Sequence, residues 1–281
     1  MSDSSSLREA RLALGQRLCA IRQERGLTAR ELARRCGWHE SKCSRIENGH
    51  ASPSIVDIRL WAQVCEASEQ ADELISMAHG IHGLYVEWRT MERAGLKQAQ
   101  ERVLPLWEQT QRFKAYAHCM VPGPLQTSAY TRAVLAAIKE RRGATDDVDL
   151  AVQARMSKQK TLTEGGRQFA VLLEESVLHY RIGDAGLMVG QLSRLLEVAV
   201  LPSVSLGVIP RDADRSAMWP VEDFWIFDGR QVNVELVSAF ITLKQSREVK
   251  QYIDAFADLG QYAVHGAGAI SLIAMALAAF A

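Results

Sequence analysis

Residues 36–53 read CGWHESKCSRIENGHASP and contain few large aliphatic side chains. Small or buried-type residues nevertheless recur at fixed offsets, among them Gly37, Cys43 and Ile46. A surface loop does not need this regularity, whereas two short helices packed around a tight turn do. Gly37 permits the positive φ angle of such a turn because it lacks a Cβ atom. The stretch therefore predicts a helix over residues 40–47 that is held against the helix before it.

The preceding sequence predicts two helices. Apolar residues recur at helical spacing from Leu7 to Ile21, and Gly26 stands where a helix-ending glycine belongs. Thr28, followed three residues later by Glu31, forms a capping box that starts the second helix. Ala33 on that helix is small, which lets the third helix cross close above it.

Two more helices are expected after the quoted stretch. Ser52 is the expected N-cap of a fourth helix, with Pro53 at its first position, which proline favours. The sequence QADELISMAH supplies a fifth helix. On the third helix, Cys43 and Ile46 point inward, so its polar side chains are left facing outward.

The charge of the chain is unevenly distributed, although its formal net charge over 281 residues is zero. Residues 7–50 hold ten Lys or Arg against five Asp or Glu, a net of +5. Residues 51–80 hold one Arg against five acidic residues, a net of −4. A basic segment that coincides with the predicted helix pair indicates a face that binds a polyanion.

Five short helices in this order, with the sequences GLTARELARRCGW and SRIENGHASPS, resemble the Xre or lambda-repressor-like family of bacterial DNA-binding domains. The resemblance extends from Leu7 to about His79 and implies a helix-turn-helix domain over residues 7–80. A rigid third helix that presents polar side chains suits the major groove of DNA. The alternative, a helical bundle with no role in DNA binding, does not account for the basic segment.

The candidate DNA-binding residues lie on the second and third helices and at the start of the fourth. Glu40, Ser41 and Arg45 are expected to read bases, because they occupy the exposed turns of the third helix. Ser52, Ser54 and the free amide groups at the start of the fourth helix are expected to hold phosphate. The full set is Arg30, Arg34, His39, Glu40, Ser41, Lys42, Ser44, Arg45, Asn48, Ser52 and Ser54.

Two positions depart from the family pattern. The family usually has Gln, which clamps a phosphate, where this chain has Ala29, so Arg30 or Arg34 is expected to substitute. It usually has Ser or Thr as N-cap of the reading helix, where this chain has His39. Lys42 is expected to contact either a phosphate or a base.

Beyond residue 80 the pattern becomes mixed. Residues 81–104 are expected to form a helical connector, which Tyr85 or Trp88 could anchor on either domain. An α+β domain is then expected over residues 105–281, following the N-terminal five-helix domain. Its predicted strands are RFKAYAHCMV, FAVLLEE, VSLGVIP, DFWIFD, QVNVEL and FITLK, and its predicted helices run through Ala137, from Leu150 to Leu162, in LMVGQLSRLLEVA and in SREVKQYIDAFADLGQYAV.

The second half also carries a family resemblance. VPGPLQT, VLLEESVL, MVGQLSRLLE and VSLGVIP occur in the order typical of a C-terminal domain of unknown function found in many actinobacterial Xre regulators. Pro124 replaces the usual Leu of the first motif. The resemblance implies an antitoxin-like regulator that is encoded beside a small companion protein.

No metal site or cofactor is expected from the spacing of potential ligands. The five cysteines include no C-x-x-C pair, which favours reduced thiols over a zinc site or a disulfide framework. His79 and His82 are three residues apart, but no acidic or cysteine partner lies at ligand spacing, so a surface pair is expected.

No catalytic pattern is found either, and a non-enzymatic protein is expected. Glu174 and Glu175 are adjacent and would face opposite sides of a strand, whereas a two-carboxylate site needs both on one side. The sequence EGGR at Glu164 lacks the flanking residues of a nucleotide-binding loop and predicts a turn. Ser128 and Ser176 have no nucleophile-elbow context.

The mixed domain is therefore expected to receive a signal. Candidate ligand-binding residues are Trp107, Tyr116, Gln126 and Tyr130, although the aromatic residues would serve equally as core. Expected partners are a palindromic double-stranded DNA operator, a second copy of the chain, and a small-molecule effector or small companion protein.

Two functions remain open, a dimeric transcriptional regulator and a protein-interaction module. A cytoplasmic location without a membrane partner is expected for both. MSDSSSLREA lacks the pattern of a signal peptide, and the apolar run over residues 267–281 is too short to span a bilayer.

Overall fold

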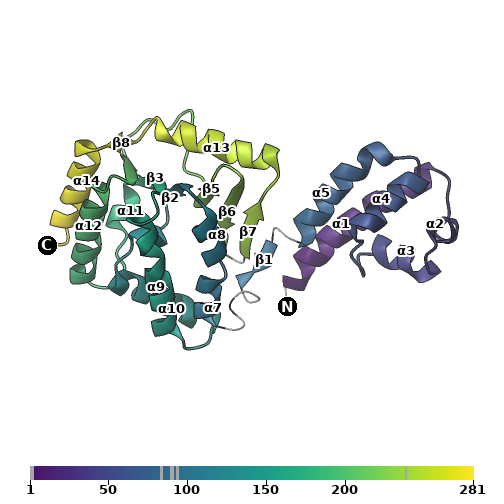
Figure 1. Ribbon diagram of the computed structural model, residues 1–281, viewed down its shortest axis with the longest axis horizontal. Helices are drawn as coiled ribbons and strands as arrows, with labels where there is room; N and C mark the ends of the chain where they lie inside the picture. The colour runs from purple at the N-terminus through teal and green to yellow at the C-terminus, as the bar shows by residue number, and fades with distance from the viewer. Residues whose placement is uncertain (1–2, 83–84, 89–91, 93–94, 238) are drawn as a thin grey trace. The chain divides into compact units, whose positions relative to one another are not determined.

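The computed structural model describes residues 3–82, 85–88, 92, 95–237 and 239–281 (Figure 1). The chain divides into two compact units, Met1–Tyr85 and Val86–Ala281. The first unit is helical and the second is built on a mixed sheet, so the expected fold class, a helical helix-turn-helix region followed by an α+β region, is confirmed.

The helices of the first unit surround one apolar core. Leu14, Leu18, Ile46 and Ile58 are buried in it together with Trp61, whose indole Nε1 donates to the Leu18 carbonyl at 3.1 Å. Because a buried indole N–H needs an acceptor, this bond completes the core. The elements are α1 (Asp3–Glu24), α2 (Ala29–Cys36), α3 (Glu40–Glu47), α4 (Ile55–Val64), the 3-10 turn η1 (Ser68–Gln70) and α5 (Ala71–His82).

Local signals fix most helix ends as expected. The capping box of Thr28 and Glu31 is present, and Gly37 has φ +68° at the end of α2. The expected start of the fourth helix was wrong by two residues. Ser54, not Ser52, is the N-cap of α4, because the Ser54 hydroxyl accepts from the Asp57 amide while the Asp57 carboxylate accepts from the Ser54 amide.

The second unit is built on an eight-stranded sheet among the described residues, with strand order β1-β7-β6-β5-β2-β3-β4-β8. Its strands are β1 (Tyr85–Glu87), β2 (Arg112–Ala117), β3 (Gln168–Glu174), β4 (Val204–Ile209), β5 (Phe224–Phe227), β6 (Gln231–Glu235), β7 (Ala239–Leu243) and β8 (Val264–His265). Strands β2, β3 and β4 run parallel, while β5 pairs antiparallel with β2 and β6, β6 with β7, and β8 with β4.

Helices cover both faces of this sheet, because successive strand residues point to opposite sides and both sides are apolar (Figure 1). One face presents Phe113, Phe169 and Leu206 to a core shared with several helices. The opposite face presents Tyr116 and Phe224 to α13 (Ser246–Gly260). The helices of the first face are α9 (Ser128–Arg142), α11 (Ser176–His179), α12 (Ala185–Ala199) and α14 (Ala267–Ala278).

The remaining elements of the second unit are short and lie between the larger ones in the chain. They are α7 (Leu96–Glu101), α8 (Leu104–Gln109), the 3-10 turn η2 (Gly123–Leu125), α10 (Val148–Ser157) and the 3-10 turn η3 (Lys158–Leu162). No helix among the described residues is both long and apolar enough to cross a membrane.

Three expectations for the second half need correction. The connector over residues 81–104 is not wholly helical, since Tyr85–Glu87 forms the edge strand β1; its residues 83–84, 89–91 and 93–94 lie outside the described residues. The helix expected to run through Ala137 continues to Arg142, where Gly143 ends it with φ +63°. The apolar run near the C-terminus, for which no element was expected, forms helix α14.

Candidate functional site

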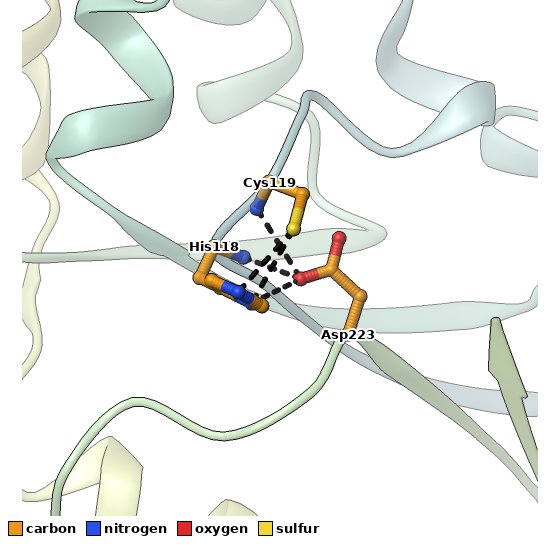
Figure 2. Close-up of side chains that lie close together, drawn as sticks. All are labelled: His118, Cys119 and Asp223. Carbon is orange, nitrogen blue, oxygen red and sulfur yellow. Dashed lines mark hydrogen bonds and ion pairs between the residues drawn. The ribbon is translucent and has the colours of Figure 1, made fainter. Parts of the chain in front are cut away.

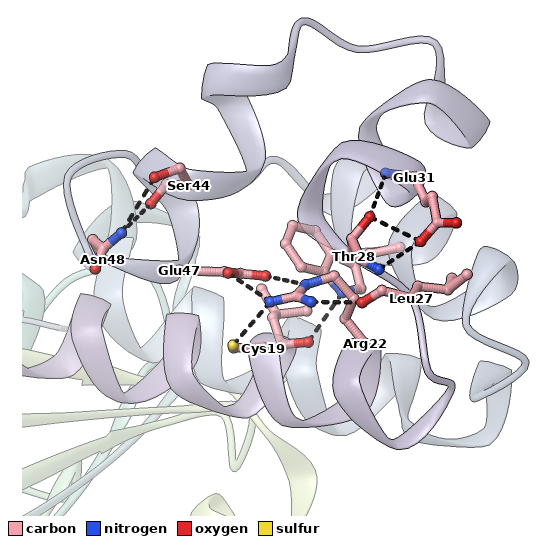
Figure 3. Close-up of polar contacts among 10 residues, drawn as sticks. Cys19, Arg22, Leu27, Thr28, Glu31, Ser44, Glu47 and Asn48 are labelled. Atoms are coloured by element: carbon pink, nitrogen blue, oxygen red, sulfur yellow. Dashed lines mark hydrogen bonds and ion pairs between the residues drawn. The ribbon is translucent and has the colours of Figure 1, made fainter.

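Helix α3 is fixed to α1 by a buried ion pair (Figure 3). The Arg22 guanidinium donates to both carboxylate oxygens of Glu47, with Nε–Oε1 at 2.6 Å and Nη2–Oε2 at 3.0 Å. A third bond runs from Arg22 Nη1 to the Leu27 carbonyl at 2.6 Å, so the same side chain also holds the turn before α2. The pair could not be predicted from the sequence, because no local pattern relates residues 25 positions apart.

The backbones of α1 and α3 also meet directly. A Cβ atom at Gly15 would lie 2.6 Å from the Glu47 carbonyl oxygen and would also overlap the carbonyl oxygen of Ile46. At Gly49, which has φ +67°, a Cβ atom would lie 2.9 Å from the Leu12 amide nitrogen. Only glycine permits these approaches, so the packing of α3 on α1 is set by backbone contact as well as by charge.

Helix α3 is connected to α4 through Lys42. Its ammonium lies 2.6 Å from Asp57 Oδ1 and 4.4 Å from the centre of the Trp38 ring. Burial opposes ionisation of Asp57, but hydrogen bonds from Lys42 and Ser54 outweigh it and lower the pKa of the carboxyl group. Lys42 is half-buried, so in this structure it braces α3 against α4 rather than extending freely.

Most of the predicted DNA-binding side chains are exposed. Lys42 and Ser52 are the two that are half-buried, and the Ser52 hydroxyl has no hydrogen-bond partner among the described residues. The exposed ones are Arg30, Arg34, His39, Glu40, Ser41, Ser44, Arg45, Asn48 and Ser54.

Several of these exposed groups already have partners. Arg30 Nε lies 3.0 Å from Glu40 Oε1, although such an exposed pair stabilises little. His39 caps α3 as expected, since its Nδ1 accepts from the Ser41 amide at 3.3 Å. Asn48 Nδ2 donates to the Ser44 carbonyl at 2.8 Å, which satisfies the end of the helix (Figure 3).

Three arginines remain available to an anionic partner. Arg34 and Arg35 on α2 and Arg45 on α3 are exposed, and none of them forms an ion pair within the part of the chain that the structure describes. Arg35 was not among the predicted residues, although it lies beside Arg34 in the sequence. The helix pair therefore presents uncompensated positive charge.

The predicted ligand-binding residues of the second unit do not share one site. Tyr116 is buried on the α13 face of the sheet, where its hydroxyl donates to Glu174 Oε1 at 2.8 Å. Tyr130 is buried in the core on the opposite face. Trp107 lines a cavity, and the buried Gln126 is connected to that cavity through Arg155, whose Nη1 donates to Gln126 Oε1 at 3.3 Å.

This cavity has a volume of about 150 Å³ and is lined by residues of the second unit. Its wall includes Trp88, close to the start of that unit in the chain, and Pro124 of the VPGPLQT motif. Arg155, Lys158 and Glu235 supply charge to it. These three residues could not be predicted from the sequence as one group, because they come from separate elements.

Glu174 and Glu175 are engaged in separate contacts. Glu174 pairs with Arg215 at 2.8 Å, whereas Glu175 accepts from the Arg211 amide at 2.9 Å, so each carboxylate has its own partners.

Two further features were expected to have no catalytic or metal-binding role. They are the turn predicted at Glu164 and the pair of His79 and His82. The glycines that follow Glu164 have φ +80° and +64°, as a turn requires. The side chains of His79 and His82 lie outside the described residues.

His118, Cys119 and Asp223 form a cluster that the sequence spacing did not suggest (Figure 2). His118 Nδ1 lies 2.6 Å from Asp223 Oδ1, and Cys119 Sγ lies 3.3 Å from His118 Nε2. Imidazole, thiolate and carboxylate are ligands that zinc accepts. The Asp223 carboxylate, however, already accepts from the amides of His118 and Cys119, and it thereby caps the end of β2.

The same cluster does not supply an activated nucleophile. Burial, followed by the charge of Asp223, raises the pKa of the Cys119 thiol above its ordinary value of 9.0. A nucleophilic cysteine needs the opposite shift, because the thiolate is the reactive form. The capping role of Asp223 is enough to explain why these side chains meet.

Two family models match the chain. Residues 13–74 match the model of a helix-turn-helix domain, which places the first unit in a class of DNA-binding domains. Residues 100–275 match the model of a domain of unknown function, DUF5753. Since that match covers more than half of the chain, the protein belongs to the DUF5753 family.

Solved structures are similar to this chain in part. One of them is that of TrmBL2, an archaeal chromatin protein described as showing a novel mode of DNA binding. The sequences are 13% identical, the match covers 74% of this chain and 65% of that one, and the TM-score is 0.33. The chain thus spans slightly less than two thirds of TrmBL2. No curated protein matches this chain.

Proposed function

We propose that the protein is a sequence-specific DNA-binding transcriptional regulator of the Xre type. The observation that carries the proposal is the exposed outer face of α3, which is fixed to α1 by the Arg22–Glu47 pair and flanked by arginines that have no ionic partner among the described residues. A rigid helix with a polar outer face and adjacent positive charge suits the major groove and its phosphates.

Base reading is assigned to the exposed turns of α3. Glu40 would accept a hydrogen bond from cytosine, and Arg45 would donate two to guanine, each worth about 1–3 kcal/mol of discrimination. Ser41 lies beside them on the same helix. Arg34 and the amide groups at the start of α4 would hold phosphate instead.

The regulator is proposed to act as a homodimer on a palindromic operator, because one short reading helix covers few base pairs. The dimer contacts are assigned to the second unit or to the segment over residues 81–104. Reading helices of the two subunits would then reach adjacent half-sites about 34 Å apart. Light scattering on the free protein and on its DNA complex tests this, and a monomer in both states contradicts it.

The second unit is proposed to receive the signal, from a small molecule or from a small companion protein, and no catalytic role is assigned to it. Cytoplasmic location follows from the proposed action on operator DNA. If the full chain binds no DNA but retains a protein partner, the antitoxin-like interaction module is the better description.

Filter binding to the DNA upstream of the protein's own gene, at several salt concentrations, tests the proposal. If Arg34, Arg35 and one further cation of each subunit each neutralise one phosphate, a dimer neutralises about six, which predicts a log–log salt slope of about −5. Binding that does not change between about 50 and about 200 mM salt would contradict DNA binding.

A further inference from the structure

The cavity of the second unit contains two cations without carboxylate partners at contact distance. Arg155 donates to the amide oxygens of Gln100, with Nε at 3.1 Å, and of Gln126, with Nη1 at 3.3 Å. Lys158 Nζ lies 3.4 Å from the same Gln100 oxygen. Within the described residues, neither cation forms an ion pair, so the groups at hydrogen-bond distance are neutral amides and Glu235 acts on both cations only at longer range.

A buried cation without a carboxylate at contact distance is unfavourable. Lys158 is 7% exposed, and burial, followed by the nearby charge of Arg155, lowers the pKa of its ammonium to about 7. Burial also lowers the pKa of Arg155. Buried charges in proteins are normally paired, and an anion placed between these two cations would restore that condition.

The charge balance indicates a monoanion. Arg142 and Glu92 form an ion pair at 2.5 Å and cancel each other. Of the other charged residues that line the cavity, Arg155 and protonated Lys158 stand against Glu235, which leaves a net charge of +1. A single carboxylate balances this charge, whereas a phosphate dianion would exceed it.

The rest of the wall combines aromatic with aliphatic and amide side chains. Its aromatic side chains are Trp88, Trp107, Trp225, Phe227 and Phe240. Trp107 and Trp225 meet edge to face with ring centres 5.1 Å apart, and the Arg142 guanidinium lies 4.3 Å from the ring centre of Trp88. The volume of about 150 Å³ equals that of an apolar protein cavity known to take up benzene.

We propose that this cavity binds a small aromatic carboxylate, with its ring among the aromatic side chains and its carboxylate between Arg155 and Lys158. That the bound carboxylate acts as a regulatory signal rests on the proposed function. Trp88 and Glu92, which line the cavity, belong to the segment that joins the two units in sequence. A ligand that contacts them is therefore placed to influence that segment.

Isothermal titration calorimetry of the full chain, without DNA, tests which class of ligand the cavity binds. The probes are benzoate, phenylacetate and 4-hydroxybenzoate, with benzamide as the neutral counterpart of benzoate. At least one carboxylate should bind with a dissociation constant of about 1 mM or lower, and benzamide should bind at least about tenfold more weakly than benzoate.

Variants identify the site. Lys158→Met should weaken carboxylate binding at least about tenfold without lowering the melting temperature, because it removes a buried charge that has no ionic partner among the described residues. Lys160→Met is the matched control, since Lys160 is exposed in the same 3-10 turn, and it should bind as the unchanged protein does. Equal loss in both variants would overturn the assignment.

The pH dependence provides a readout that a purely structural role would not give. Above pH 7, Lys158 must take up a proton to pair with the ligand, so affinity should fall about tenfold between about pH 6 and about pH 8. Arg155 and Glu235 are the charged groups that act on Lys158. In Lys158→Met this dependence should vanish; if it persists, Glu235 is responsible and the role of Lys158 is wrong.

Failure of all three carboxylates to bind, or equal binding of benzoate and benzamide, would overturn the inference. Neither result bears on DNA binding, which filter binding measures separately. Conversely, a chain that binds carboxylates but not DNA would keep the cavity assignment and refute the proposed function.

Discussion

The ion pair between Arg22 and Glu47 should contribute strongly to stability, and the contribution of each side chain should depend on the presence of the other. The two side chains are only 10% and 12% exposed, so solvent screens their interaction little. Replacing Glu47 with Leu removes two charged hydrogen bonds and leaves a buried guanidinium whose remaining acceptors are the Leu27 carbonyl and the Cys19 sulfur. We expect a loss of about 3–5 kcal/mol in the free energy of unfolding.

The double variant Arg22→Met with Glu47→Leu should recover most of this loss. It leaves no unpaired charge and fills the space with apolar groups of similar volume. Such a replacement of a buried ion pair often leaves the stability unchanged. A double-mutant cycle should therefore give a coupling energy of about 2 kcal/mol or more. Urea unfolding of the full chain, followed by hydrogen exchange of peptides from α1 and α3, is to be measured on the unchanged protein, on both single variants and on the double variant.

The chain offers a matched control in Glu66→Leu. The Glu66 carboxylate pairs with Arg25 on the surface, where the Arg25 and Glu66 side chains are 45% and 65% exposed, so the cost should stay below about 1 kcal/mol. If Glu47→Leu is as mild as Glu66→Leu, or if the cycle shows no coupling, α3 is not fixed by this ion pair.

Three further outcomes are expected. Gly15→Ala should lower the free energy of unfolding by about 1–3 kcal/mol and reduce DNA affinity in filter binding, because its methyl group displaces the end of α3. The control Gly190→Ala, whose methyl group meets open space, should change neither quantity. Arg34→Ala should make the salt slope of a dimer shallower by about two, because Arg34 is the residue assigned to phosphate. Lys42→Ala should change it less, since that ammonium is already paired with a carboxylate of α4, and an equal change would refute this. Alkylation of Cys119 by iodoacetamide should accelerate roughly tenfold per pH unit from about pH 7 to about pH 9, and a plateau below that range would contradict its raised pKa.

The sequence by itself determined the helices of the first unit, because the signals that start and end them are local. The capping box at Thr28 and the positive φ of Gly37 act within a few residues, and α3 covers residues 40–47 as predicted. The same locality explains the error at α4. Both Ser52 and Ser54 carry a hydroxyl that can cap a helix, and the carboxylate of Asp57, three residues after Ser54, decides between them.

Most strands of the second unit were also predictable, since runs of apolar and β-branched residues bounded by Gly, Pro and Asp mark them. Their pairing was not. The parallel pairing of β2 with β3 joins Arg112 to Gln168, and the antiparallel pairing of β2 with β5 joins Phe113 to Phe227. No local propensity encodes a pairing between residues so far apart in the chain.

Only the tertiary structure decided which side chains meet. Arg22 reaches Glu47 from one helix to another, and the cavity gathers Trp88, Lys158 and Glu235 from three separate elements. Burial then sets their chemistry, since it lowers the pKa of Lys158, whose ammonium has no ion pair among the described residues. Hydrophobic periodicity specifies where an element lies, whereas the charge that a site presents depends on its neighbours in space, and those neighbours exist only once the chain has folded.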